Sequence, residues 1–95
     1  MIFPKKGTAL APMRALTQAP FWRLLNPYGA PDAYFSEFVR VHEHYVIESA
    51  WIEEALAAVE GRPLWIQLMG NDLKALEASI RILEQYPIAG IDFNV

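Results

Sequence analysis

A short and almost continuously apolar segment, residues 64–70, constrains the fold of this chain more than any other feature. It reads Leu-Trp-Ile-Gln-Leu-Met-Gly and follows Gly61, Arg62 and Pro63, which stop the preceding helix-like segment. Strands of this composition are typical of parallel sheets that are covered on both faces. We therefore expect a strand here that is buried on both faces, with Gln67 as its polar residue.

Three further apolar runs alternate with helix-like segments. The runs at residues 9–13, 33–39 and 88–94 predict strands. This order, βαβαβαβ, predicts an α/β fold with parallel strands and right-handed crossovers. Because the last strand lacks a further partner, we expect a part of a larger α/β domain. The first predicted helix begins at Thr17 and ends near Pro27 and Gly29, and the second covers about residues 46–60. The third predicted helix begins at Asn71 or Asp72 and ends at Pro87.

Apolar residues recur at helical spacing in the second and third predicted helices. We expect these faces to pack on the sheet, and the charged residues between them to face water. The tryptophans Trp22, Trp51 and Trp65 are expected in the core or between helices. The apolar positions are Ile47, Trp51, Ala55 and Val59 in the second helix, and Leu73, Leu76, Ile80 and Leu83 in the third.

Composition limits the class of protein. With 54% hydrophobic and 13% aromatic residues the chain can form a core, and the absence of cysteine excludes disulfides and thiolate metal sites. No apolar stretch approaches the roughly 18 residues of a membrane span, so we expect a cytoplasmic protein. His42, Glu43 and His44 lack the spacing of a zinc helix, and we expect a solvated loop and no metal site there.

Charge is unevenly distributed along the chain. Residues 1–40 carry five basic and two acidic side chains, whereas residues 41–95 carry three basic and nine acidic ones. Dedicated nucleic-acid-binding modules make many phosphate contacts, which an acidic segment does not favour. Charge alone therefore argues weakly against RNA binding.

Amide side chains dominate the ends of the predicted strands, where parallel α/β folds bind ligands. Gln67 and Asn94 can both donate and accept, which suits the edge of a planar heterocycle with carbonyls and ring nitrogens. Alternatively, Gln67 is structural and satisfies neighbouring groups in the sheet. No nucleophile with an adjacent base is present. The residues at these ends are Pro12, Met13, Arg14, Ser36, Glu37, Gln67, Gly70, Asn71, Asp72, Asp92 and Asn94.

Four motifs stand at the ends of the predicted strands: Ala11-Pro12-Met13, Ser36-Glu37-Phe38, Gln67-Leu68-Met69-Gly70-Asn71-Asp72 and Ile91-Asp92-Phe93-Asn94. In this order and spacing, the motifs resemble the N-terminal half of the tRNA-dihydrouridine synthase family. The resemblance implies that residues 1–95 are the N-terminal part of a flavin-binding TIM-barrel domain, a (βα)3β partial barrel. It implies an oxidoreductase in which NADPH reduces FMN and the flavin reduces uridine in tRNA to 5,6-dihydrouridine.

The family pattern implies roles for four residues. Pro12 and Met13 would pack at the isoalloxazine ring of FMN, and Gln67 would hydrogen-bond the polar edge of that ring. Asn94 would face both the flavin and the substrate base. Glu37 matches a recurrent acidic position whose role stays open.

The resemblance is incomplete at the end of the sequence. The family continues from the asparagine that matches Asn94 into a Gly-Cys-Pro segment whose cysteine protonates the base, and this chain ends at Val95. The second half-barrel and the C-terminal helical domain that helps to hold tRNA are also missing. We therefore expect no catalytic residue within the chain, an inactive isolated chain, and self-association through exposed strand edges.

Two other functions stay open. One is a different FMN-dependent TIM-barrel oxidoreductase that acts on a small molecule. The other is a non-catalytic half-barrel that associates with a second half or with itself.

Overall fold

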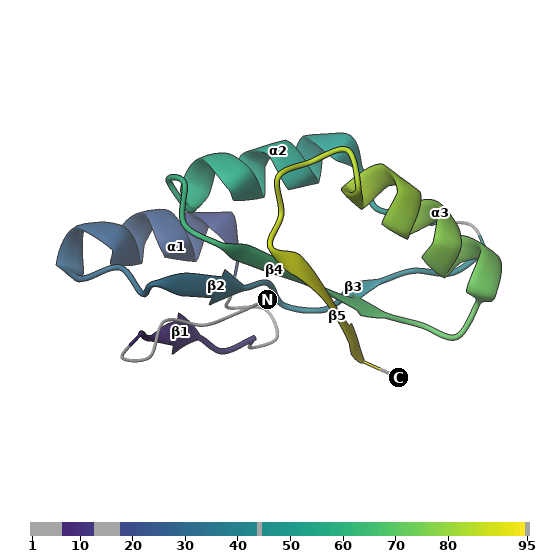
Figure 1. The fold of residues 1–95 in the computed structure, drawn as a ribbon, viewed down its shortest axis with the longest axis horizontal. Helices are drawn as coiled ribbons and strands as arrows, with labels where there is room; N and C mark the ends of the chain where they lie inside the picture. Colours follow the sequence, from purple (N-terminus) through teal and green to yellow (C-terminus); the bar gives the residue numbers. More distant parts are fainter. Residues whose placement is uncertain (1–6, 13–17, 44, 95) are drawn as a thin grey trace.

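The computed structural model describes residues 7–12, 18–43 and 45–94, which form a layer of strands covered by helices on one side (Figure 1). A 3-10 turn, η1, directly extends the first helix. In chain order the elements are β1 (Ala9–Leu10), α1 (Ala19–Leu25), η1 (Asn26–Tyr28), β2 (Ala33–Phe35), β3 (Val39–Arg40), α2 (Ser49–Ala58), β4 (Leu64–Met69), α3 (Leu73–Leu83) and β5 (Gly90–Asn94).

The named strands all pair in parallel. Strand β1 lies beside β2, strands β2 and β3 both pair with β4, and β5 also pairs with β4. Helices α1, α2 and α3 connect these strands on the same side of the sheet (Figure 1). This arrangement confirms the α/β fold with parallel strands and is that of a partial TIM barrel.

Strand β4 has one covered and one open face. Leu64, Ile66 and Leu68 are fully buried and belong to the same core cluster as residues of all three helices. The alternate residues, Trp65, Gln67 and Met69, are half-buried. The expected burial of both faces is therefore wrong for the described residues, because the helices cover one face of the sheet (Figure 1).

The second predicted strand, residues 33–39, is divided into β2 and β3. Phe35 pairs with Trp65 and Val39 pairs with Leu68, so four steps along one strand lie opposite three steps along β4. The extra residue is a β-bulge, a feature that often lies beside active sites. A bulge of this kind is not visible in an apolar run, which is why the sequence predicts one continuous strand.

Ser36 completes the strand pairing inside the bulge. Its backbone N–H donates to the carbonyl oxygen of Trp65 at 2.9 Å, and its hydroxyl oxygen accepts from the backbone N–H of Gln67 at 3.1 Å. The same hydroxyl donates to the carbonyl oxygen of Glu37 at 2.8 Å. The buried Ser36 side chain thus holds the backbone at Gln67.

Replacing this serine with alanine is expected to destabilise the fold. Ser36→Ala leaves the N–H of Gln67 without its acceptor, which should lower the free energy of unfolding by about 1–3 kcal/mol. Urea unfolding followed by circular dichroism measures this change. The control is Ser49→Ala, at an exposed position of α2, where a change within about 0.5 kcal/mol is expected. Equal stability of the two variants would contradict the role given to Ser36.

The helices differ from their predicted bounds mainly at their ends. Helix α1 has Gln18 as its N-cap, and the expected cap Thr17 lies outside the described residues. Helix α2 is shorter than residues 46–60 at both ends. Helix α3 begins as predicted after Asp72, whose Oδ1 accepts from the N–H of Ala75 at 3.0 Å.

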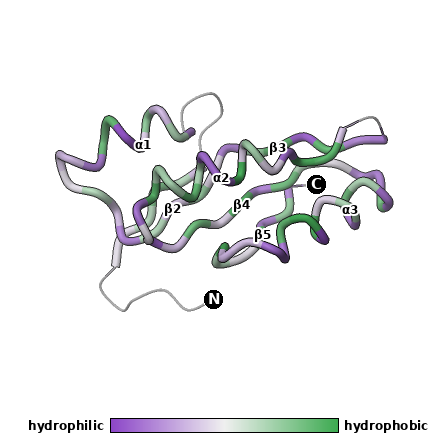
Figure 2. The backbone as a smooth tube through the Cα atoms, turned by 90° about the horizontal axis from the view of Figure 1, so that it is seen from above, coloured by the Kyte–Doolittle hydropathy of each residue, from purple (hydrophilic) through white to green (hydrophobic). Residues whose placement is uncertain are grey.

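The predicted apolar face of α3 is correct except at its start. Leu83 is fully buried and Leu76 and Ile80 pack against the core, but Leu73 is 80% exposed. Hydrophilic and hydrophobic segments alternate along α3 (Figure 2). Leu73 is the first residue of α3. In α2 the predicted residues Ile47, Ala55 and Val59 are buried, and Trp51 is half-buried.

A buried aromatic pair joins α1 to β2. The ring centroids of Trp22 and Tyr34 lie 5.2 Å apart, and both side chains are fully buried. The Tyr34 hydroxyl donates to Asn26 Oδ1, and Asn26 Nδ2 donates to the carbonyl oxygen of Ala58 at 2.8 Å. Burial raises the pKa of Tyr34.

No helix in the described ranges has the length and apolar character needed to cross a membrane.

Candidate functional site

The residues expected at the ligand site lie along the carboxyl edge of the sheet. Gln67 is half-buried in β4, Asn94 is exposed at the end of β5, and Pro12 is exposed shortly after β1. Met13 lies outside the described residues. Gln67 and Asn94 lie on the neighbouring strands β4 and β5. Pro12 lies further along the same edge, because β2 separates β1 from β4.

An amide–carboxylate pair joins β4 to β5 at this edge. Gln67 and Asp92 are partners in the strand register, and Gln67 Nε2 donates to Asp92 Oδ2 at 2.8 Å. Asn94 follows Asp92 by two residues, so its side chain leaves the same face about 7 Å further along β5. One N–H of the Gln67 amide therefore bonds to a neighbouring group in the sheet, as the structural interpretation of this residue predicts.

The face that carries Gln67 is aromatic away from this edge. The rings of Phe35 and Trp65 are stacked, with 5.5 Å between centroids and 8° between planes. The Trp65 ring also covers Gly90, where an added Cβ would lie 2.4 Å from Trp65 Cζ3. Trp65 precedes Gln67 by two residues on the same face. The polar groups of this face are thus concentrated toward the carboxyl edge, where a polar ligand would bind.

A broad hollow of about 370 Å³ lies beside the bulge and includes Glu37, Arg40 and Tyr45. The Arg40 guanidinium lies 5.8 Å from the centre of the Phe38 ring. Burial raises the pKa of Tyr45, with a further contribution from the Glu48 carboxylate. Glu37, which the sequence could not assign, therefore lies among cationic and aromatic groups.

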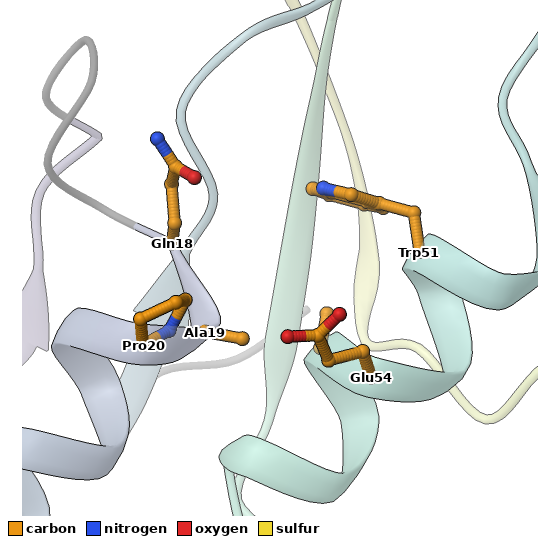
Figure 3. Close-up of a pocket in the computed structure, with 6 residues that line it drawn as sticks. Gln18, Ala19, Pro20, Trp51 and Glu54 are labelled. Atoms are coloured by element: carbon orange, nitrogen blue, oxygen red, sulfur yellow. The ribbon is translucent and has the colours of Figure 1, made fainter.

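A smaller hollow of about 110 Å³ lies between the start of α1 and α2 (Figure 3). Gln18 extends from the α1 side, and Trp51 and Glu54 extend from α2 (Figure 3). Glu54 also forms an exposed ion pair with Arg23 at 3.6 Å. Gln67 lines neither this hollow nor the one beside the bulge.

Two residues of this edge were not included among the expected ligand-binding residues. Asp92 hydrogen-bonds Gln67, and Ser36 holds its backbone. Side chains two residues apart in a strand point to the same face, so the sequence already indicated that Asp92 shares the face of Asn94. The role of Ser36 depends on the bulge, for which the sequence gave no signal.

The segment around His42 forms a turn. The backbone groups of His42 and Tyr45 bond to each other in both directions, at 3.1 and 3.0 Å. His42 and Glu43 are exposed, and His44 lies outside the described residues. Within the described ranges, no group of three or more histidine, aspartate and glutamate side chains could hold a metal ion.

Comparison with known protein families gives a match over most of the chain. Residues 9–95 match the model of the dihydrouridine synthase (Dus) family. The chain belongs to the dihydrouridine synthase family. The match includes all the strands and helices described above. Comparisons with curated proteins and with solved structures gave no match.

Membership of the dihydrouridine synthase family confirms the resemblance found in the four motifs. The family consists of oxidoreductases that act on uridine in tRNA, and its model covers Pro12, Gln67 and Asn94. This chain therefore carries a dihydrouridine synthase domain with the parallel α/β fold of a partial TIM barrel.

Proposed function

We propose that residues 1–95 form the N-terminal part of the flavin-binding TIM-barrel domain of a tRNA-dihydrouridine synthase. The enzyme would use FMN and NADPH to reduce uridine in tRNA to 5,6-dihydrouridine in the cytoplasm. Family membership supports this reaction over that of an FMN barrel acting on a small molecule. FMN, when bound, supplies the hydride transfer chemistry.

The observation that carries the proposal is the Gln67 amide at the carboxyl edge. One N–H of this amide bonds to Asp92, and the described residues provide no hydrogen-bond partner for Oε1. A half-buried amide with a remaining acceptor and donor fits the pyrimidine-like edge of a flavin, which carries carbonyls and an N–H. The donor set of this edge thus fits FMN.

The other proposed contacts follow from the same edge. Pro12 and Met13 would pack against the isoalloxazine ring, and Asn94 would contact both the flavin and the uracil base. Asn94 is exposed at the end of β5, on the face of Gln67 and Asp92, which supports the proposal that it contacts a ligand.

Protonation of the substrate requires a further group. The 95 residues contain no cysteine, so the thiol that the family uses as an acid is not among them. We propose that these residues bind flavin and that the isolated chain does not reduce uridine in tRNA.

Titration with FMN tests the proposed site. Binding is followed by the change in flavin fluorescence, and Gln67→Met should weaken it about tenfold, as expected for the loss of roughly 1.4 kcal/mol of hydrogen bonding. The matched control is Gln85→Met, which replaces an exposed glutamine after α3 and should leave the affinity unchanged. Absence of FMN binding by the unaltered chain, or equal affinities of the two variants, would contradict the proposal.

A further inference from the structure

A glutamine side chain at an open sheet edge has two orientations that differ by a half-turn of its amide. In one, the oxygen faces the ligand, and in the other, the NH2 group does. The orientation decides whether the residue accepts from the ligand or only donates to it. A neighbour that can only accept a hydrogen bond fixes this choice.

Asp92 is such a neighbour. An ionised carboxylate has no proton to donate, and its Oδ2 lies 2.8 Å from Gln67 Nε2. The two residues face each other in the strand register, with Ile66 and Ile91 as the preceding pair. The carboxylate therefore holds the NH2 group on the β5 side and leaves Gln67 Oε1 for another partner.

The backbone of Gln67 is fixed independently. Its N–H donates to the buried Ser36 hydroxyl at 3.1 Å, which locks the strand at this position. The side chain itself is only half-buried, so packing alone does not prevent rotation of the amide. Among the described residues, the bond to Asp92 is the hydrogen bond that orients this side chain.

We propose that Asp92 is a positioning residue that orients the Gln67 amide to accept from an imide N–H, the N–H between two carbonyls of a planar heterocycle. This inference rests on the proposed function, in which the heterocycle is the flavin. Uracil carries the same imide group, so the chemistry alone fits both rings. With Oε1 as acceptor and the second N–H as donor, Gln67 matches the adjacent N–H and carbonyl of an imide.

The test compares ligands with and without the imide hydrogen. The unaltered chain should bind FMN about tenfold more tightly than FMN methylated at the imide nitrogen, because methylation removes the donor. In Asp92→Asn, the new amide can donate or accept, so Gln67 is no longer held in one orientation. This variant should bind FMN about twofold more weakly, because about half of the Gln67 amides would then face the ligand with the wrong group, and its preference for the imide hydrogen should fall by about half.

Glu84→Gln is the matched control, because it makes the same chemical change at an exposed position after α3. It should retain both the affinity and the preference of the unaltered chain. A second arm uses uridine 5′-monophosphate and its imide-methylated form. If only the uridine pair loses its preference in Asp92→Asn, positioning by Asp92 is supported with uracil as the ligand.

A readout without ligand separates this inference from the proposed function. In the NMR spectrum, the side-chain NH2 signals of Gln67 should move in Asp92→Asn and not in Glu84→Gln. If FMN does not bind but these signals move, the proposed function fails and the orientation of Gln67 by Asp92 is supported. If FMN binds and Asp92→Asn keeps the full preference for the imide hydrogen with both the flavin pair and the uridine pair, or if the signals do not move, the inference is overturned.

Discussion

Gly70→Ala is expected to destabilise the chain by at least about 2 kcal/mol, since it combines backbone strain with a steric clash. Gly70 follows β4 with φ +156°, and an added Cβ would lie 2.4 Å from the carbonyl oxygen of Val41. Because this neighbour is backbone, relief requires separation of the end of β4 from the segment that follows β3. That movement would also displace Gln67, three residues earlier. Urea unfolding measures the loss of stability, and FMN titration measures its effect on the site.

Gly29→Ala is the matched control for the clash. Gly29 also has a positive φ, +128°, but its added Cβ would meet no atom within 4 Å among the described residues other than its chain neighbours. This variant should show strain without the clash and should therefore lose less stability than Gly70→Ala. Equal losses would show that the close approach of Gly70 to Val41 does not contribute.

Trp22→Ala is expected to lower the free energy of unfolding by about 3–5 kcal/mol, as for other large aromatic residues removed from a core. Trp22 is fully buried and packs against Tyr34 with 5.2 Å between ring centroids. Since small domains have total stabilities of about 5–15 kcal/mol, much of the stability would be lost. Circular dichroism during urea unfolding measures the change without dependence on the tryptophan signal.

Two variants control this result. Leu24→Ala replaces a residue of the same helix that is 66% exposed, and it should change stability by no more than about 0.5 kcal/mol. Trp22→Phe should cost less than Trp22→Ala, because it keeps a ring beside Tyr34 and removes an indole N–H for which the described part of the chain offers no hydrogen-bond partner. A Trp22→Ala variant as stable as Leu24→Ala would contradict the assigned core.

The architecture could be predicted because its signals are local. Gly61 and Pro63 separate α2 from β4, Asp72 caps α3, and the apolar runs alternate with helical patterns. The β-bulge could not be predicted, because it depends on how residues 36–38 meet β4. Burial of β4 on both faces was an incorrect expectation, because composition does not define which face the helices cover.

The candidate site was only partly predictable for a similar reason. Topology places Gln67 and Asn94 at one edge of the sheet, as their positions at strand ends indicated. The bond from Gln67 to Asp92 depends on the register between β4 and β5, which no single strand specifies. The sequence therefore indicated the amide, and the structure identified the residue that orients it.

Chemical-shift mapping of FMN on the 15N-labelled chain tests the central claim most directly. If the carboxyl edge binds the flavin, the largest shifts should occur at the amides of Gln67, Asp92 and Asn94. Residues of the hollow between α1 and α2, such as Gln18 and Glu54, should shift little. Shifts confined to that hollow, or no shifts at saturating FMN, would contradict a flavin site at the ends of β4 and β5.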